Sequence, residues 1–203
     1  MIKAVIFDVG GVIIDFSEEK YLTWLSKKIG IDYERADKVI EPLIKEMESG
    51  RLKLRDAERI FSKKLDLPLG SLMWTKGFSE TASPSVEVVN ILKDLSKNYK
   101  IGVITNVSFS RYYESRKLVL KSLILKKFIK EIIASCYFGV RKPDARIFKE
   151  MLRRLKVNPE EAVFIDNQIE NVEGAAKLGI HAILFTNADK LKEDLKDLGI
   201  KVD

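Results

Sequence analysis

The order of apolar and polar positions divides the chain into short buried runs and longer segments with helical spacing. The first apolar run ends at Asp8, and four similar runs follow in the second half of the chain. Short, nearly continuous apolar runs bounded by turn residues are typical of strands that are buried on both faces. The predicted strands cover residues 1–8, 101–105, 131–135, 162–166 and 181–185.

Segments with helical spacing connect these strands. They cover residues 85–98, 145–155, 171–178 and 187–198, and a longer helical stretch after Thr105 is broken around Ser122. Pro143 is expected in the first turn of the helix that continues over residues 145–155. Strands that alternate with helices predict an α/β fold with a parallel sheet and right-handed crossover connections.

A block of helices without a convincing strand separates the first strand from the other four. Its predicted helices cover residues 17–30, residues 33–49 with a bend or break at Pro42, and residues 54–65, whereas residues 67–80 form no clear element. Because this block interrupts the α/β pattern, we interpret residues 17–83 as an inserted helical cap. Residues 1–16 and 84–203 then form the core.

Composition narrows the class of protein. Of the 203 residues, 46% are hydrophobic and 33% charged, which is typical of a globular protein that folds without a disulfide or a structural metal. The 36 Lys and Arg residues exceed the 30 Asp and Glu residues, but they are spread along the chain, unlike the basic stripe of a nucleic-acid-binding protein. No apolar run is long enough for a signal peptide or a membrane span. We therefore expect a cytoplasmic protein that binds neither nucleic acid nor a membrane.

Two further compositional features refine this expectation. Cys136 is the only cysteine, so an intrachain disulfide and a cysteine zinc cluster are excluded. Gln168 is the only glutamine, and Lys and Glu are used heavily. Few thermolabile residues and many charged ones favour a protein from a thermophile.

Four polar residues lie at or just beyond the ends of the first four predicted strands. They are, in chain order, Asp8, Thr105, Lys142 and Asp166. Ligands of open α/β sheets bind in the crevice outside the carboxyl ends of the strands. Two carboxylates, a hydroxyl and an ammonium are suited to a cation and a phosphate. A loop role would explain any one of these residues, but it does not explain four at equivalent positions of the sheet.

These residues lie in four motifs whose order and spacing resemble those of the haloacid dehalogenase-like (HAD) hydrolase superfamily. The motifs are FDVGGV at residues 7–12, VITN at residues 103–106, Lys142 within VRKPDARIF, and VFIDNQIENVEGA at residues 163–175. The resemblance covers nearly the whole chain. It implies a Rossmann-like core with strand order 5-4-1-2-3 and a helical cap inserted after the first motif. Most members of the superfamily are magnesium-dependent phosphatases.

The resemblance also implies a role for each motif residue. Asp8 corresponds to the nucleophile that forms an aspartyl-phosphate, with Mg²⁺ and Lys142 supplying positive charge. Thr105 and the amide of Asn106 correspond to the groups that hold the phosphoryl oxygens. Asp8, Asp166 and the backbone carbonyl of Gly10 correspond to the metal ligands, with Asn167 beside them.

Two positions depart from the usual pattern of the superfamily. Gly10 stands where a second aspartate normally protonates the leaving group, so the carbonyl ligand is kept but the acid is lost. Asp15 or an acid from the cap could replace it. A subgroup that includes sugar-1-phosphate phosphatases resembles the chain closely, with the same glycine. At Asn167 the usual second acid is replaced by an amide, which is a weaker ligand for a hard cation.

Three functions remain open at this point. The first is a Mg²⁺-dependent phosphatase of a small phosphorylated metabolite, such as a sugar phosphate. The second is a metal-independent 2-haloacid dehalogenase, although Asp166 argues against it because those relatives replace this acid with a small hydroxyl residue. The third is a catalytically weakened protein that binds a ligand, which Gly10 and Asn167 would suit. The chain is expected to be a monomer or a homodimer.

Other conspicuous residues are expected to be structural. His181 begins a strand away from the predicted catalytic edge, and Trp24 and Trp74 are expected to pack in the cap or at the surface. We expect Arg111 and Arg116 to be solvated on a helix rather than to bind phosphate. Arg141 is expected on an exposed loop, with contact to the substrate as the alternative because it lies beside Lys142.

Overall fold

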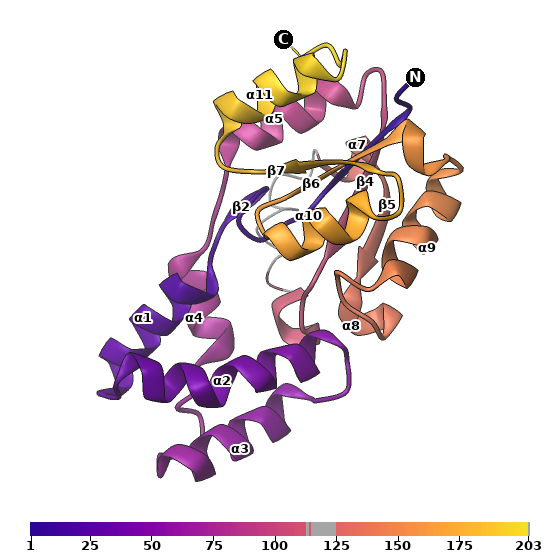
Figure 1. Cartoon of the computed structure of the whole chain (residues 1–203). Helices are drawn as coiled ribbons and strands as arrows, with labels where there is room; N and C mark the ends of the chain where they lie inside the picture. The colour runs from indigo at the N-terminus through magenta and orange to yellow at the C-terminus, as the bar shows by residue number, and fades with distance from the viewer. Residues whose placement is uncertain (113, 115–124, 203) are drawn as a thin grey trace.

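The computed structural model describes residues 1–112, 114 and 125–202, and forms two adjoining parts (Figure 1). One part is a sheet with helices on both faces. The other is a group of helices, α1 to α4, that lies beyond one end of the sheet, while both chain termini lie at the far end of the molecule. Much of the helical stretch predicted after Thr105, including its break around Ser122 and Arg116, falls outside the described residues.

The main sheet consists of five parallel strands in the order β5-β4-β1-β6-β7. If these five strands are numbered 1 to 5 along the chain and the sheet is read from β7 to β5, the order is 5-4-1-2-3, as predicted. The prediction of an α/β fold with a Rossmann-like three-layer core is thus confirmed. The strands are β1 (Ala4–Phe7), β4 (Lys100–Thr105), β5 (Ile129–Ala134), β6 (Ala162–Asp166) and β7 (His181–Leu184).

Alternate residues of the central strands point to opposite faces of the sheet, and helices bury both faces. In β1, Val5 and Phe7 pack in the cluster that includes α5 (Val86–Leu95) and α11 (Ala188–Asp197). Ala4 and Ile6 pack in a second cluster on the other face. The helices of that face are α9 (Ala145–Leu155) and α10 (Ile169–Ala176). Burial on both faces explains why these strands are nearly continuous apolar runs.

Three short elements complete the core. They are α7 (Leu125–Phe128), α8 (Ser135–Phe138) and the 3-10 helix η1 (Pro159–Glu161). His181, the first residue of β7, is exposed at the edge of the sheet. Among the described residues, no helix is both long enough and apolar enough to cross a membrane.

The helical unit, defined here as helices α1 to α4 (residues 18–81), has a hydrophobic cluster of its own. Tyr21, Phe61 and Trp74 are the bulkiest members of this cluster that are almost completely buried. Its helices are α1 (Glu18–Ile29), α2 (Tyr33–Glu48), α3 (Leu54–Leu65) and α4 (Trp74–Thr81). Helix α2 runs through Pro42 without being split.

Two very short strands join the core to the helical unit. β2 (Ile14–Asp15) pairs antiparallel with β3 (Ser83–Pro84), so the chain enters and leaves the helical unit through adjacent segments. This two-stranded ribbon was not expected from the sequence. Two-residue strands give no measurable periodicity, and each owes its conformation to a partner far away in the chain.

The position of Pro143 differs from the prediction. Helix α9 begins at Ala145, and the side chain of Asp144 caps it by accepting a hydrogen bond from the backbone N–H of Arg146 at 2.9 Å. Pro143 therefore precedes the cap instead of occupying the first turn. Aspartate is among the best N-cap residues because its carboxylate satisfies a free N–H of the first turn, and this preference determines the start of the helix.

Candidate active site

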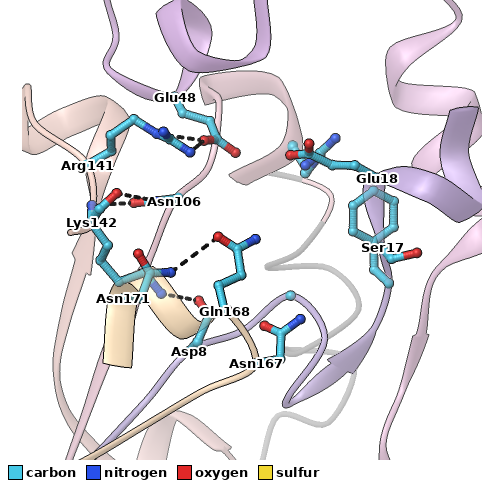
Figure 2. A pocket seen from close by; sticks show the side chains of 13 residues that line it. Asp8, Ser17, Glu18, Glu48, Asn106, Arg141, Lys142, Asn167, Gln168 and Asn171 are labelled. Carbon is cyan, nitrogen blue, oxygen red and sulfur yellow. Dashed lines mark hydrogen bonds and ion pairs between the residues drawn. The ribbon is translucent and has the colours of Figure 1, made fainter. Parts of the chain in front are cut away.

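A pocket lies at the carboxyl ends of the strands, between the sheet and the helical unit (Figure 2). Its cavity volume is about 130 Å³, which is suited to a small molecule. Loops that follow the strands supply most of the lining, while the helical unit and the segment before it supply the rest. The lining residues are Asp8, Gly10, Phe16, Ser17, Glu18, Glu48, Asn106, Arg111, Arg141, Lys142, Asn167, Gln168 and Asn171.

Three of the four polar residues that the sequence singled out meet at one point. Asp8 follows β1 directly, Asp166 is the last residue of β6, and Lys142 lies in the loop before α9. The ammonium Nζ of Lys142 donates to Asp8 Oδ1 at 2.6 Å and to Asp166 Oδ2 at 2.6 Å. One cation therefore joins two carboxylates that come from neighbouring strands of the sheet.

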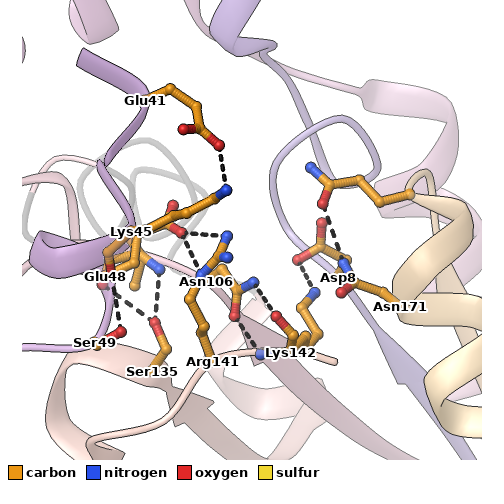
Figure 3. A network of polar contacts seen from close by, with 12 residues as sticks. Asp8, Glu41, Lys45, Glu48, Ser49, Asn106, Ser135, Arg141, Lys142 and Asn171 are labelled. Atoms are coloured by element: carbon orange, nitrogen blue, oxygen red, sulfur yellow. Dashed lines mark hydrogen bonds and ion pairs between the residues drawn. The ribbon is translucent and has the colours of Figure 1, made fainter. Parts of the chain in front are cut away.

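Lys142 is held in place along its whole length. Its side chain is only 1% exposed, and Nζ also donates to the backbone carbonyl of Ile104 at 3.1 Å. The side chain of Asn106 binds the Lys142 backbone twice: Oδ1 accepts from its N–H at 2.8 Å, and Nδ2 donates to its carbonyl at 3.1 Å (Figure 3). Asn106 thus positions the lysine as well as lining the pocket.

Both oxygens of Asp166 accept hydrogen bonds. Besides Lys142, the donors are the backbone N–H of Gln168 at 2.8 Å and Nδ2 of Asn171, which lies 3.1 Å from each oxygen. Asp166 is fully buried and does not itself line the pocket. These hydrogen bonds fix the position and orientation of the Asp166 carboxylate beside Lys142.

The electrostatics of Asp8 and Lys142 follow from their burial. Burial raises the pKa of Asp8 to about 7, because Lys142 only partly offsets the desolvation and the neighbouring Asp166 adds to it. Burial alone would lower the pKa of Lys142, but the two carboxylates outweigh that effect and raise it. Lys142 is therefore cationic, and the site has room for further positive charge.

Of the other predicted site residues, some line the pocket and one does not. Gly10 and Asn167 line the pocket. The amide of Asn167 lies against Gly11, where a Cβ would come within 2.4 Å of Nδ2, and Gly11 has a φ of +81°. Only glycine combines a positive φ with the absence of a side chain that would collide with Asn167. Thr105, at the end of β4, is buried and does not line the pocket, although its neighbour Asn106 does.

The oxygen donors near Asp8 fit a hard divalent cation. Among the described residues, no group of three or more His, Cys, Asp or Glu side chains surrounds a common point. Mg²⁺ keeps several of its waters in proteins, so one or two carboxylates can be sufficient. Asp8, Gly10 and Asn167 line the pocket, so a carboxylate, a backbone carbonyl and a side-chain amide would be the oxygen donors within reach of such a cation.

Two arginines in the pocket contradict the sequence-based expectation. Arg111, which we expected to be solvated, is only 6% exposed. Arg141, which we expected on an exposed loop, is partly buried and forms an ion pair with Glu48 at the end of α2, with Nη2 2.9 Å from Oε2 (Figure 3). Their partners and neighbours come from the helical unit, far away in the chain, so no local pattern predicts their burial.

Two acids of the pocket also come from the helical unit. Glu48 is almost fully buried and bound by Arg141. Glu18, in the first turn of α1, is partly buried, and both burial and the nearby Glu48 raise the pKa of its carboxyl. Asp15, which the sequence suggested as an alternative acid, is exposed, forms an ion pair with Lys20 and does not line the pocket.

Comparison with known proteins identifies the family. A family model described as haloacid dehalogenase-like hydrolase matches residues 2–179. The chain belongs to this family. This confirms the resemblance found in the four motifs, and with it the prediction of a hydrolase of the phosphomonoesterase type.

The relatives of this HAD-like hydrolase include several phosphatases. It is 30% identical to glyceraldehyde 3-phosphate phosphatase of Methanothermobacter thermautotrophicus over 200 residues, which cover 92% of this chain and 87% of the relative. It is 23% identical to D-ribitol-5-phosphate phosphatase of Bacteroides thetaiotaomicron, with 96% and 97% covered. A segment of 95 residues is 36% identical to a chloroplast flavin mononucleotide hydrolase of Arabidopsis thaliana, but this match covers only 39% of that protein.

Solved structures support the same fold over the whole HAD-like chain. A HAD-like family hydrolase from Porphyromonas gingivalis superposes with a TM-score of 0.79 at 25% identity, covering 99% of both chains. A HAD family enzyme from Bacteroides thetaiotaomicron, solved as a magnesium complex, superposes with a TM-score of 0.80 at 20% identity, with 98% of this chain and 99% of that one covered.

Proposed function

We propose that this protein is a Mg²⁺-dependent phosphatase of a small phosphorylated metabolite, such as a sugar phosphate, and that it acts through an aspartyl-phosphate. The observation that carries the proposal is the pair of carboxylates, Asp8 and Asp166, joined by the buried Nζ of Lys142 at the base of the pocket. The named phosphatases among its relatives support the substrate class. We also propose that residues 17–83 act as a cap over this site.

The proposed reaction assigns the nucleophile to Asp8. A carboxylate oxygen of Asp8 would attack phosphorus, and the bond between phosphorus and the leaving-group oxygen would break. Water would then attack the phosphorus of the aspartyl-phosphate, releasing inorganic phosphate and restoring Asp8. Lys142 would offset the negative charge that gathers when a carboxylate approaches a phosphate. The backbone amide of Asn106, which lines the pocket, would hold a phosphoryl oxygen, whereas Thr105 lies behind it and would act only by positioning this segment.

A bound Mg²⁺ would supply further positive charge for the phosphoryl oxygens. Asp8, the carbonyl of Gly10 and Asn167 are the groups on the pocket wall that would hold it. Because both Asp166 oxygens already accept hydrogen bonds, we propose that Asp166 contributes through its charge and through water. The amide of Asn167 would make a weaker bond than a carboxylate would.

Hydrolysis of p-nitrophenyl phosphate at elevated temperature, with Mg²⁺ or with EDTA, tests the proposed function. We expect turnover with Mg²⁺ and its loss with EDTA. The nitrophenol leaving group needs little protonation, so the assay does not depend on the acid that Gly10 lacks. Metal-independent halide release from a 2-haloacid, without phosphatase activity, would instead indicate a dehalogenase. Binding of a phosphate analogue without any turnover would indicate a binding protein.

Glu18 is the acid that we propose in place of the missing aspartate. It lines the pocket, whereas Asp15 does not, and its raised pKa favours a carboxyl that holds a proton. General acid catalysis contributes about 10²- to 10⁴-fold, and mostly for leaving groups that are poor without a proton.

We therefore expect Glu18→Gln to slow hydrolysis of an alkyl phosphate by about 100-fold and that of p-nitrophenyl phosphate by only a few-fold. Steady-state rates on the two esters measure this difference. Glu19→Gln is the matched control, because Glu19 is the next residue of α1 and is exposed. Equal slowing of both esters would rule out a proton-donating role for Glu18.

A further inference from the structure

Arg111 is a buried cation for which the protein provides no hydrogen-bond partner at two of its nitrogens. It lies six residues after the end of β4, its side chain lines the pocket, and it is only 6% exposed. In the described part of the chain, neither Nε nor Nη2 has a hydrogen-bond partner, and both are shut off from solvent. Buried arginines are normally paired, because a buried charge without a partner strongly destabilises the folded state.

Aromatic rings hold the guanidinium instead of a carboxylate. Its Cζ atom lies 4.0 Å from the ring centroid of Trp74 and 4.5 Å from that of Phe16, with Phe78 at 5.7 Å. Such cation–π contacts orient a guanidinium without neutralising its charge. Trp74 is in turn fixed, because its Nε1 donates to the hydroxyl of Ser108 at 3.0 Å.

The charges around Arg111 do not offset its burial. Glu48 and Glu18 attract the guanidinium, yet burial prevails and lowers the pKa of Arg111. Glu48 is already bound by Arg141. The side chain of Arg111 thus lines the pocket while, among the described residues, its Nε and Nη2 have no hydrogen-bond partner.

The location of Arg111 indicates which part of a substrate it would meet. Asp8 and Lys142 form the base of the pocket beside the sheet, where the phosphate is proposed to react. Trp74 and Phe78 belong to α4, so Arg111 is packed against the helical unit. A phosphate at the base would leave the organic part of the ester to extend toward this side.

We infer that Arg111 determines substrate specificity by donating hydrogen bonds to oxygen acceptors on the leaving group of the phosphate ester, while Trp74 and Phe16 position its guanidinium. This inference rests on the proposed phosphatase function. Arg111 would favour esters whose carbon chain carries hydroxyl, carbonyl or carboxylate oxygens over esters of plain alkyl alcohols. A guanidinium is suited to this task, because it presents several N–H donors in one plane.

The test compares three esters that share a short alkyl chain: propyl phosphate, glycerol 3-phosphate and 3-phosphoglycerate. We expect the wild-type protein to prefer one or both oxygenated esters over propyl phosphate, and Arg111→Met to lower kcat/KM for the preferred ester by about 10- to 100-fold. Propyl phosphate and p-nitrophenyl phosphate should change by less than about threefold. The loss should lie mainly in KM. The preferred ester shows whether the acceptor is neutral or anionic.

Three further measurements guard against a merely structural explanation. Arg59→Met, which removes an exposed arginine of α3, should retain the wild-type preference. Arg111→Lys should have an intermediate effect, because it keeps the charge but loses the planar donors. The Tm of Arg111→Met without ligand should be no lower than that of the wild type, since the variant removes a desolvated charge.

The outcomes separate this inference from the proposed function. If the wild-type protein hydrolyses no phosphate ester, the proposed function fails. If it hydrolyses esters but does not discriminate among the three, or if Arg111→Met keeps the wild-type preference, the inference about Arg111 is wrong. Equal losses on all esters, p-nitrophenyl phosphate included, would also contradict it, because they would place Arg111 at the phosphate.

Discussion

Replacing Asp8 with asparagine is expected to abolish phosphatase turnover, with a loss of kcat of about 10⁴-fold or more. The amide keeps the shape of the side chain but is a poor nucleophile. The amide oxygen can still accept from the Lys142 ammonium, but it no longer offers that ammonium a negative charge. Rates on p-nitrophenyl phosphate with Mg²⁺ present measure the effect.

The fold should tolerate this change, because the charged form of Asp8 is already disfavoured by burial. The Tm of Asp8→Asn should therefore stay close to that of the wild type. Asp15→Asn is the matched control, since Asp15 is exposed, paired with Lys20 and outside the pocket, and it should retain full activity. An Asp8→Asn variant within tenfold of the wild-type rate would exclude Asp8 as the nucleophile.

Replacing Lys142 with methionine is expected to affect both activity and stability. The ammonium is the cation between Asp8 and Asp166, and it is almost fully buried. Removing one partner of a buried ionic group leaves uncompensated charge, which costs about 3–5 kcal/mol. For a chain of this length, about 3 kcal/mol corresponds to a Tm lower by about 6–12 °C. Phosphatase turnover should be lost as well.

Two comparisons test whether the lost stability comes from repulsion between the Asp8 and Asp166 carboxylates. The double variant Lys142→Met with Asp166→Asn should be more stable than Lys142→Met alone, because one of the repelling charges is gone. Mg²⁺ should raise the Tm of Lys142→Met more than that of the wild type, since no ammonium then competes for the carboxylates. Lys149→Met, at an exposed position of α9, is the control. An unchanged Tm in Lys142→Met would show that Lys142 does not hold this centre together.

The sheet was predictable from the sequence because its strands are buried on both faces. Val5 and Phe7 pack on one side of β1 and Ala4 and Ile6 on the other, so the apolar run is continuous and its length excludes a helix. Helix α4 was harder to predict. It begins after Met73, which has a φ of +46°, and methionine gives no sign of a left-handed conformation.

The part of the site that lies within the four sequence motifs was predictable. Asp8, Lys142 and Asp166 could be selected because each lies at or beyond the carboxyl end of a strand, and these ends share one edge of the sheet. That Lys142 lies between the two carboxylates could not be predicted, because this depends on the path of the loop before α9. The error at Arg111 has a similar cause: its neighbours Phe16 and Trp74 belong to distant segments, and tertiary packing decided its environment.

The ribbon formed by β2 and β3 has a consequence for how this architecture can vary. Asp15 and Ser83 are register partners in an antiparallel pair, so the chain leaves the core and returns to it at almost the same point. Opposite residues of such a pair lie about 5 Å apart, a gap that a tight turn can close as well as a long insertion. The segment inserted between β2 and β3 can therefore differ greatly in length while the strand register of the parallel sheet stays the same. The length of chain between the first and second core strands is thus free to change without altering the position of Asp8.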